Sequence, residues 1–392
     1  MEFNPFAYDF HQDPHPTYAW LRENAPVYYN PDLDFWALSR FTDVLEALHD
    51  YRTYSSAEGI TIEDRAATAG DGDGPLRSML ELDPPMHTAL RQIIARRFSP
   101  RQIAGLEPLV RNTTRSLLDQ LGGRDGFDIV GEFSALLPTT VVATMLGFPV
   151  ERHDDLRIWT EAVLHRQPGN KDVTPAGVDA ISNMMMLSAQ VVAERRRSPG
   201  EDLLSSLVQS EVDGRPPTDA EMLGFCLVLI TGGHETTSKL IANGIRLFRS
   251  HPSQRQLVAE DPERMRPAVE ELLRFTSPTQ YMARTTTRDV ELHGTTIPEG
   301  ARVALLLGCG NRDPREFDRP EEFDITRRNA RILAFGHGAH VCLGAAVARL
   351  EGRVALQEFL TRFPDYEVDE SGVELLHSGN VHGPSKVPVS VA

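Results

Sequence analysis

The sequence has little of three features that would point to other functions. It has three cysteines in 392 residues, an odd and widely spaced set that provides no disulfide framework. It has 40 Lys and Arg against 56 Asp and Glu, and this net charge of −16 argues against nucleic-acid binding, which usually needs a basic surface. It has no run near the ~20 apolar residues of a membrane span, and its start lacks the basic and apolar regions of a signal peptide. We therefore expect a cytoplasmic protein in a reducing compartment, with no membrane span and no nucleic-acid partner.

The pattern of apolar residues predicts a protein that is mainly α with small β-sheets. Hydrophobic residues make up 41% of the chain, which is ample for a large core, although the length alone suggests two or three domains. Periodicity and turn signals predict helices at about 16–23, 41–48, 103–121, 129–145, 152–164, 178–197 and 220–250. They predict short strands at 27–29, 35–39, 281–287, 290–292, 303–307 and 387–391.

One cysteine stands out from the other two. Cys342 lies in a glycine-rich stretch, residues 335–345, and an apolar helical pattern follows at once. This places the cysteine at a helix N-terminus, where free N–H groups and the helix dipole favour an anion and hence a thiolate that can bind a metal. Glycines allow the backbone to approach something large and flat. Cys226 and Cys309 are interpreted as small buried hydrophobic residues.

Two further segments carry polar residues in patterns that are typical of ligand-binding sites. His87 and Arg91 lie four residues apart on a predicted helix face, where they can hold an acidic group between them. The stretch from Leu227 to Ser238 places two glycines, an acid and two threonines inside an apolar helix, and we expect such residues to bend or open it. A zinc-protease motif fails there, because Ser238 stands where the second histidine belongs.

Glu271 and Arg274 form a common type of helical pair that is weak evidence alone. A basic cluster at Arg96 and Arg97 is either a docking site for an acidic partner or a solvated charged face.

Together these segments resemble the cytochrome P-450 family, in its soluble bacterial form. The haem-binding loop of that family has five defined positions at fixed spacing, and all five match here: Phe335, Gly338, His340, Cys342 and Gly344. The resemblance implies one helix-rich domain over residues 1–392, shaped like a triangular prism, that binds haem b through the Cys342 thiolate. It also implies propionate partners at His87, Arg91, Arg284 and His340.

The resemblance further implies an oxygen-activation helix at about 220–250, with Glu235 and Thr236 as the catalytic acid and alcohol. Glu271, Arg274 and Arg327 match a structural triad of the family. The expected function is a haem-thiolate monooxygenase that inserts one atom of dioxygen into a hydrophobic small molecule, most simply by hydroxylation. No Gly-x-Gly-x-x-Gly joins a strand to a helix, so the electrons are expected from a separate ferredoxin and its NAD(P)H-dependent reductase. We expect a monomer.

Other classes of function stay open on the sequence alone. A haem-thiolate enzyme could use peroxide directly, or couple or rearrange its substrate, and a haem-binding sensor or carrier would have no turnover. No motif of the sequence identifies the substrate. The candidate substrate pocket includes the 57–80 loop and the 150–195 helices. Single candidates for the pocket wall are Leu227, Val228, Ile230, Thr231, Thr279, Gln280 and Met282.

Overall fold

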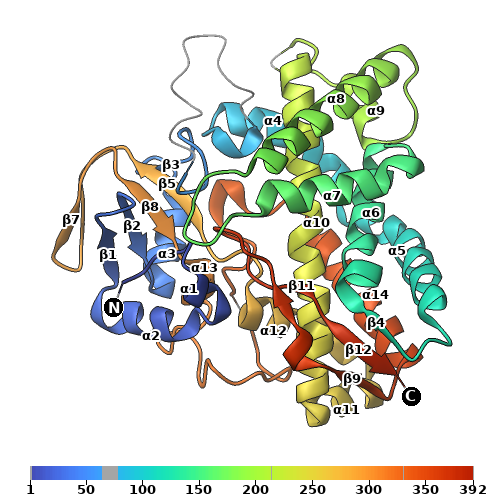
Figure 1. Ribbon diagram of the computed structural model, residues 1–392. Coiled ribbons are helices and arrows are strands. Elements are labelled where there is room, and N and C mark those ends of the chain that lie inside the picture. Colours follow the sequence, from blue (N-terminus) through green and yellow to red (C-terminus); the bar gives the residue numbers. More distant parts are fainter. Residues whose placement is uncertain (1, 64–77, 213, 330, 392) are drawn as a thin grey trace.

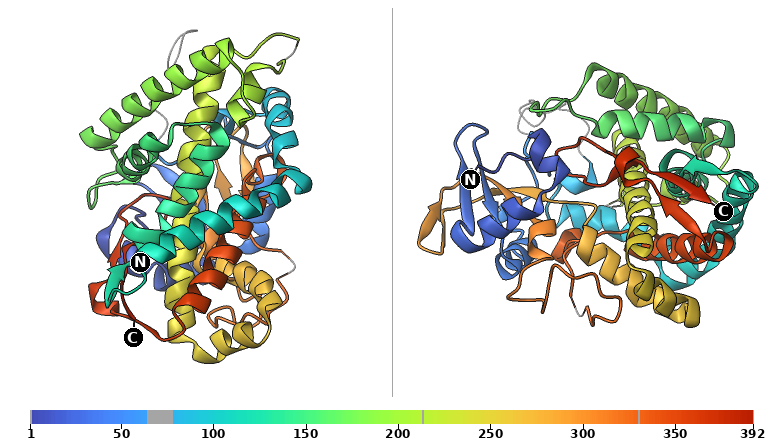
Figure 2. Two further views of the ribbon diagram at one scale, coloured as in Figure 1. Left: turned by 90° about the vertical axis from the view of Figure 1, so that its right-hand side faces the viewer. Right: turned by 60° about the horizontal axis from the view of Figure 1, so that its bottom comes forward.

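The computed structural model describes residues 2–63, 78–212, 214–329 and 331–391. A sheet near the N-terminus occupies one side of the molecule, most of the helices occupy the other, and helix α10 runs between them (Figure 1). Figure 2 shows α10 crossing the molecule with other helices packed around it. The predicted fold class, mainly α with small β-sheets, is confirmed.

The helices vary widely in length. Their bounds are α1 (Tyr8–Gln12), α2 (His15–Asn24), α3 (Phe41–His49), α4 (Met86–Ala95), α5 (Pro100–Leu121), α6 (Leu136–Leu146), α7 (His153–Leu164), α8 (Pro175–Arg197), α9 (Leu203–Val208), α10 (Asp219–Ser250), α11 (Pro252–Glu260), α12 (Met265–Thr276), α13 (Leu307–Gly310) and α14 (Ala345–Arg362). None of the described helices is long and apolar enough to cross a membrane.

The largest sheet has the strand order β1-β2-β8-β5-β3, and only its β2–β8 pair is parallel. Its strands are β1 (Val27–Asn30), β2 (Phe35–Leu38), β3 (Tyr54–Ser55), β5 (Met282–Thr286) and β8 (Arg302–Leu305). A second sheet has the order β4-β12-β9. The remaining strands are β4 (Gly126–Asp128), β6 (Val290–Leu292), β7 (Thr295–Ile297), β9 (Tyr366–Val368), β10 (Glu374–Leu375), β11 (Pro384–Lys386) and β12 (Pro388–Val391).

Most predicted elements are present, with ends shifted by a few residues. One exception is the predicted helix 129–145, which divides into a π-helical turn at Val130–Ser134 and α6. A second exception is the predicted opening of the helix around residues 227–238, which is wrong, because α10 continues without a break. The Thr231 and Thr236 hydroxyls do bond to carbonyls one turn back, at 2.7 and 3.2 Å, but the backbone ladder persists. Residues 64–77 of the predicted pocket loop lie outside the described residues.

Helix α10 is the element around which the core is built. Thr218 and Glu221 cap its start reciprocally, with Glu221 Oε2 accepting from the Thr218 N–H at 2.7 Å and Thr218 Oγ1 accepting from the Glu221 N–H. Its second half is almost entirely buried against α12 and α14. At Gly244 a Cβ would lie 2.9 Å from Leu356 of α14, so glycine permits this close approach.

A segment near the start of the chain meets a segment near its end at a histidine cluster. The rings of His11 and His377 lie 4.3 Å apart, and His382 Nε2 hydrogen-bonds to the carbonyl of His11 at 2.9 Å. Burial lowers the pKa of His11 to about 3, so this histidine is neutral.

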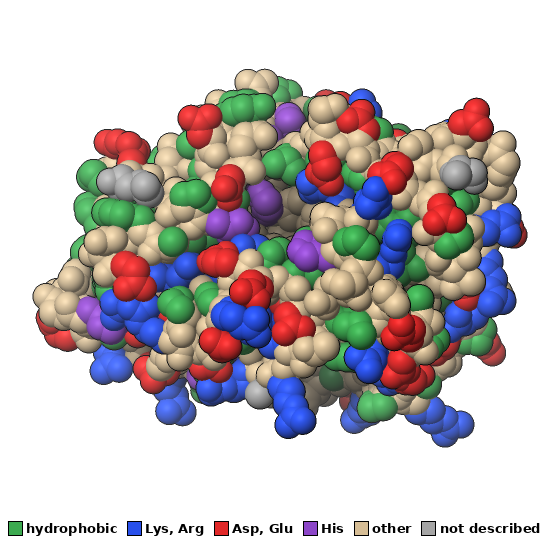
Figure 3. Space-filling model, turned by 90° about the horizontal axis from the view of Figure 1, so that it is seen from below, with side chains coloured by type: hydrophobic (Ala, Val, Ile, Leu, Met, Phe, Trp, Pro, Cys, Tyr) green, Lys and Arg blue, Asp and Glu red, His purple; other side chains and the backbone are tan. Residues whose placement is uncertain are grey.

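Figure 3 shows one face of the molecule, where histidines gather around a central hollow and acidic and basic side chains are interspersed.

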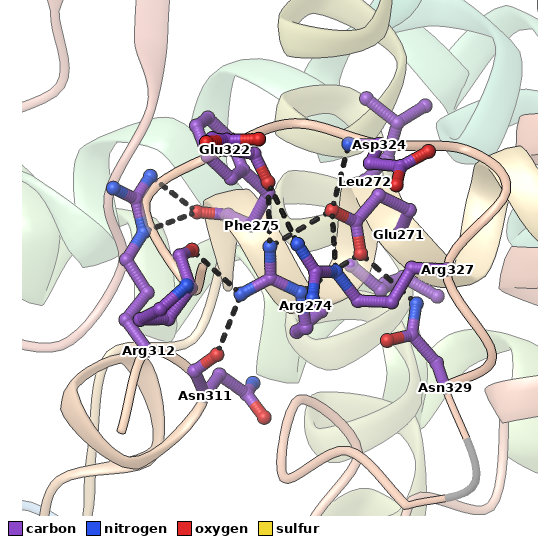
Figure 4. A network of polar contacts seen from close by, with 12 residues as sticks. Glu271, Leu272, Arg274, Phe275, Asn311, Arg312, Glu322, Asp324, Arg327 and Asn329 are labelled. Atoms are coloured by element: carbon purple, nitrogen blue, oxygen red, sulfur yellow. Dashed lines mark hydrogen bonds and ion pairs between the residues drawn. The ribbon is translucent and has the colours of Figure 1, made fainter. Parts of the chain in front are cut away.

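A buried ion-pair network ties α12 to the segment that leads to the cysteine loop (Figure 4). Arg274 donates from Nε and Nη2 to the two oxygens of Glu271 at 2.8 Å, and both side chains are 0% exposed. Arg274 Nη1 also donates to the carbonyls of Asn311 and Pro320, each at 2.9 Å. Glu271 accepts further bonds from Arg327 Nε and from the Asp324 N–H. The structure thus brings together Glu271, Arg274 and Arg327, the three residues predicted as a triad.

We predict that Glu271→Ala lowers the free energy of unfolding by about 3–5 kcal/mol, because it leaves Arg274 buried without its counter-charge. Denaturant titration of the purified protein measures this loss. The control is Glu370→Ala, which removes an exposed ion pair with Arg246 and should change stability by about 0.5 kcal/mol or less. Equal losses in the two variants would contradict a special role for the buried network. If Glu271→Ala does not fold, Glu271→Gln tests the same charge with a smaller change in shape.

Glu351 of α14 generates a prediction about pH. Its Oε2 is buried with no hydrogen-bond partner among the described residues, and burial raises its pKa to about 8. Between its ordinary value and about 8, the folded protein holds a proton that the unfolded chain has lost. The free energy of unfolding therefore falls as pH rises through this window.

Glu351→Gln should flatten the fall in melting temperature between about pH 5 and about pH 8, because the amide does not ionise. The matched control is Glu358→Gln on the same helix. Arginines Arg111 and Arg115 hold the pKa of Glu358 below its ordinary value, so its contribution lies at lower pH. An unchanged pH dependence in Glu351→Gln would show that Glu351 does not carry the buried proton.

Candidate functional site

The cysteine loop is held by its own backbone and by α3. The N–H of Cys342 donates to the carbonyl of Phe335 at 2.8 Å, and α14 begins three residues after the cysteine. Gly338 has φ +69°, and a Cβ there would lie 2.3 Å from the carbonyl oxygen of Leu48 at the end of α3. Only glycine fits this approach. The guanidinium carbon of Arg349 lies over the Phe335 ring, 4.5 Å from the ring centre.

Cys342 is the one accessible cysteine of the three, and Cys226 and Cys309 are buried as predicted. Protein around the sulfur raises the pKa of the Cys342 thiol, although the Gly344 and Ala345 N–H groups and Arg91 and Arg349 oppose this. The protein groups alone therefore disfavour the free thiolate that the helix terminus favours. A metal ion bound to the sulfur would displace the proton directly.

A cluster of cationic and imidazole side chains lies beside the loop. His87 and Arg91 come from α4, Arg284 from β5, and His340 from the loop itself. The rings of His87 and His340 lie 4.1 Å apart, and Arg91 Nη2 donates to the carbonyl of Val341. Burial, with Arg284, His87 and Arg91, lowers the pKa of His340 to about 3. The structure thus brings together the four residues predicted to hold propionates.

This cluster has a deficit of hydrogen-bond acceptors. Both ring nitrogens of His87 and Nδ1 of His340 are buried without a partner among the described residues. Arg284 is 5% exposed, and burial, together with the neighbouring Arg302, lowers its pKa to about 10. Buried donors and charges normally have partners, so the cluster suits an anionic ligand such as a pair of carboxylates.

The middle of α10 carries accessible residues, although most of the second half of the helix is buried. The side chains of Leu227, Val228, Thr231 and Thr236 are partly accessible, and Gly232 is exposed. A Cβ on Gly232 or on Gly344 would meet nothing within 4 Å. Leu343, next to the cysteine, packs against the same core cluster as Leu227. The room beside each of these glycines and the cluster of cations that lacks acceptors fit a flat group that carries carboxylates.

Glu235 and Thr236 face different surroundings. Glu235 is 1% exposed, and its Oε2 lies 2.6 Å from Nζ of Lys239. Thr236 is partly accessible, and its Oγ1 donates to the carbonyl of the exposed Gly232. Lys239, together with Glu161 and Arg157 of α7, was missed by the sequence analysis. The four-residue spacing from Glu235 to Lys239 is the signal that could have identified the first of them.

Two predicted members of the substrate pocket do not line an accessible surface. Ile230 is 1% exposed in a core cluster. Gln280 accepts from the Tyr18 hydroxyl at 2.8 Å and donates to the carbonyl of Ser277 at 2.6 Å, so its side chain supports the fold. Leu227, Val228, Thr231, Thr279 and Met282 remain partly accessible.

Comparison with known proteins agrees with this geometry. The family model described as Cytochrome P450 matches residues 178–376. The chain is 40% identical to the putative cytochrome P450 123 of Mycobacterium tuberculosis, over 100% of this chain and 97% of that relative. It is 39% identical to the erythromycin C-12 hydroxylase of Saccharopolyspora erythraea, over 91% and 89% of the two chains.

A solved structure, cytochrome P450 CYP109Q5 from Chondromyces apiculatus, superposes with a TM-score of 0.88 at 33% identity, covering 100% of this chain and 98% of that one. The family implies haem b with a cysteine thiolate as iron ligand, and the acceptor-poor cations, the open glycine surfaces and the accessible cysteine of this chain fit that group. The chain belongs to the cytochrome P450 family and is a haem-dependent monooxygenase.

Proposed function

We propose that this monooxygenase hydroxylates a hydrophobic small molecule, using dioxygen and electrons from a separate ferredoxin and its NAD(P)H-dependent reductase. One set of observations supports the proposal: Cys342 is accessible, the stretch of α10 with Thr236 is partly accessible, and Leu343 beside the cysteine packs against the same core cluster as Leu227 of α10. The partly accessible residues there include Leu227, Val228 and Leu343, which suits an apolar substrate. We propose a cytoplasmic monomer, with Arg96 and Arg97 near α4 as the docking point for an acidic ferredoxin.

In this proposal each residue of the site has a distinct task. Cys342 ligates the haem iron, and thiolate ligation of haem favours cleavage of the O–O bond. His87, Arg91, Arg284 and His340 neutralise and hydrogen-bond the two propionates. Thr236 holds a proton at Oγ1 on the side of α10 that borders the interior, and Glu235 supplies protons to it. Glu271, Arg274 and Arg327 fix the segment that leads to the cysteine loop.

One observation favours a second candidate function. The Glu235 carboxylate is paired with Lys239 and turned from Thr236, so proton supply for dioxygen chemistry needs a change of partner. An enzyme driven by peroxide, or one that couples or rearranges its substrate, has less need of that supply. Measuring dioxygen consumption against peroxide-driven product formation separates the two. A sensor or carrier would form no product in either assay.

The substrate can be approached by direct binding. Titrating the holoprotein with apolar macrolides, steroids and fatty acids, and following the spin-state shift in the haem spectrum, identifies compounds that reach the interior. Compounds that shift the spectrum then enter turnover assays with ferredoxin, reductase and NAD(P)H. This screen reports on binding before any assumption is made about the product.

Replacing the iron ligand should abolish the spectral signature of a thiolate. We expect the reduced carbon-monoxide complex of the native protein to show the red-shifted Soret band of thiolate ligation, and Cys342→Ser to lose it, because a hydroxyl does not donate comparable electron density. Cys309→Ser, which changes a buried cysteine far from the loop in sequence, is the control. A histidine-type spectrum in the native protein would overturn the ligand assignment.

Removing the alcohol of α10 should divert electrons without stopping their uptake. We expect Thr236→Ala to form at least about five-fold less product per NADH, with a matching rise in hydrogen peroxide, because a positioned proton donor is lost. The control is Thr276→Ala, which removes a hydroxyl that bonds one turn back in the same way on α12. Unchanged coupling in Thr236→Ala would rule out proton delivery by this residue.

A further inference from the structure

His234 of α10 is buried, and its imidazole ring has no hydrogen-bond partner. The residue is 1% exposed, and neither ring nitrogen bonds to any atom of the described residues. His153 of α7 shows the usual arrangement of a buried histidine, because its Nε2 hydrogen-bonds to the Phe148 carbonyl at 3.2 Å. Unpaired polar groups are costly to bury, so the ring nitrogens of His234 indicate a place for a water or an ion.

Two carboxylates face this ring from two helices. His234 Nδ1 lies 3.8 Å from Oε1 of Glu235, its neighbour on α10. Ligand atoms of Glu161 on α7, His234 and Glu235 all lie within 4.8 Å of one another, and no other three histidine, cysteine or carboxylate side chains among the described residues do so. Shifts of less than about 1 Å would bring the three atoms to the ~2.0–2.2 Å bond lengths of a zinc ion.

The cluster keeps a net negative charge although two cations already lie in it. Glu161 accepts from Arg157 Nη1 at 2.8 Å, and Glu235 Oε2 lies 2.6 Å from Lys239 Nζ. Asp154 also accepts from Arg157, at 2.8 Å. Three carboxylates therefore stand against two cations, and Glu161 and Glu235 each hold their cation through a single oxygen. The second oxygen of each can bind a further cation.

We propose that Glu161, His234 and Glu235 form a binding site for Zn²⁺ between α7 and α10, with water as the fourth ligand. One imidazole nitrogen and two carboxylate oxygens suit Zn²⁺, which often takes three protein ligands and a water. Mg²⁺ and Ca²⁺ favour oxygen ligands, so the imidazole selects against them. The Glu161 side chain is 40% exposed and gives the ion a path from solvent. This inference does not rest on the proposed function, because it concerns the protein without turnover.

Lys239 limits the affinity of this site. Its side chain is 3% exposed, and its ammonium group contacts the carboxylate that would also bind the ion. Two cations beside one carboxylate repel each other, so zinc has to displace the ammonium group or release a proton from it. We therefore infer a reversible site rather than a permanent structural one. Removal of the lysine charge should strengthen zinc binding, which is the reverse of what loss of a ligand does.

The test measures zinc binding to the haem-loaded protein without an affinity tag. The protein is first treated with a chelator and then dialysed against Zn²⁺ at buffered free concentrations, and bound zinc per chain and melting temperature are recorded. Glu161→Gln and His234→Gln remove ligands. Asp154→Asn is the matched control for Glu161→Gln, because both carboxylates bond to Arg157 but only Glu161 belongs to the cluster.

Two further variants complete the design. Lys239→Met removes the competing cation. His377→Ala alters the other histidine cluster of the molecule, where its ring lies 4.3 Å from that of His11, and so controls for zinc bound elsewhere. The reduced carbon-monoxide spectrum checks that each variant folds around its haem. Glu161 lies partly at the surface, so its variant keeps the test decisive if a variant of the buried His234 does not fold.

We expect one zinc ion per native chain, with a melting temperature that rises with free zinc, because the ion binds only the folded arrangement of α7 and α10. Glu161→Gln and His234→Gln should each weaken binding at least about ten-fold. Asp154→Asn and His377→Ala should stay within about two-fold of native, and Lys239→Met should bind at least about ten-fold more tightly. An excess of Mg²⁺ should not displace the zinc.

X-ray absorption at the zinc edge identifies the ligands directly. We expect nitrogen and oxygen neighbours at about 2.0–2.2 Å, an imidazole among them and no sulfur. The inference is overturned if the native protein binds zinc no more tightly than Glu161→Gln, or if sulfur ligates the bound ion. It is equally overturned if Lys239→Met binds zinc no more tightly than native, because the ion would then lie away from Glu235. None of these outcomes bears on the proposed function, which is tested by turnover.

Discussion

The contact between the cysteine loop and the end of α3 sets the geometry of the site. Gly338 brings the loop backbone so close to Leu48 that no side chain fits, and the Cys342 N–H closes the turn onto Phe335. The sulfur is thereby fixed at the start of α14. That helix is fixed against α10 by a second close approach, at Gly244. Two glycine contacts therefore determine how the sulfur lies relative to the accessible stretch of α10, and substitution at either would move the whole site.

Buried polar and charged groups are partnered in three different ways in this molecule. Arg274 is saturated, since Glu271 and backbone carbonyls use its donors, and such a network supports the fold. His87 and His340 are not saturated, since ring nitrogens of both lack a partner in the described part of the chain, and such nitrogens mark the place where a ligand completes the protein. Glu235 is neutralised by Lys239 yet lies beside a second carboxyl group. The state of the partners, more than burial itself, separates scaffold from site.

Sequence patterns located the parts of the site that depend on local geometry. The cysteine at a helix start, the placement of His87 and Arg91 on one helix face and the pairing of Glu271 with Arg274 each need only spacing along one element. Sequence patterns failed to predict features that depend on contacts between segments far apart in the sequence. The protein groups around the sulfur outweigh the helix terminus in setting the pKa of Cys342, although the residue itself is accessible. Packing keeps α10 helical through Gly232 and Gly233. Gln280 is occupied by Tyr18, 262 residues away, a contact that no local pattern reveals.

The continuity of α10 also decides what its acid and alcohol can do. Adjacent residues on an unbroken helix point about 100° apart, so Glu235 and Thr236 cannot face the same space. Thr236 is partly accessible, whereas Glu235 is buried at the contact with α7. A carboxylate buried on that side needs a counter-charge, and Lys239, one turn later, supplies it. The pair therefore joins two sides of the helix rather than one, and any proton that reaches Thr236 through Glu235 must originate on the α7 side.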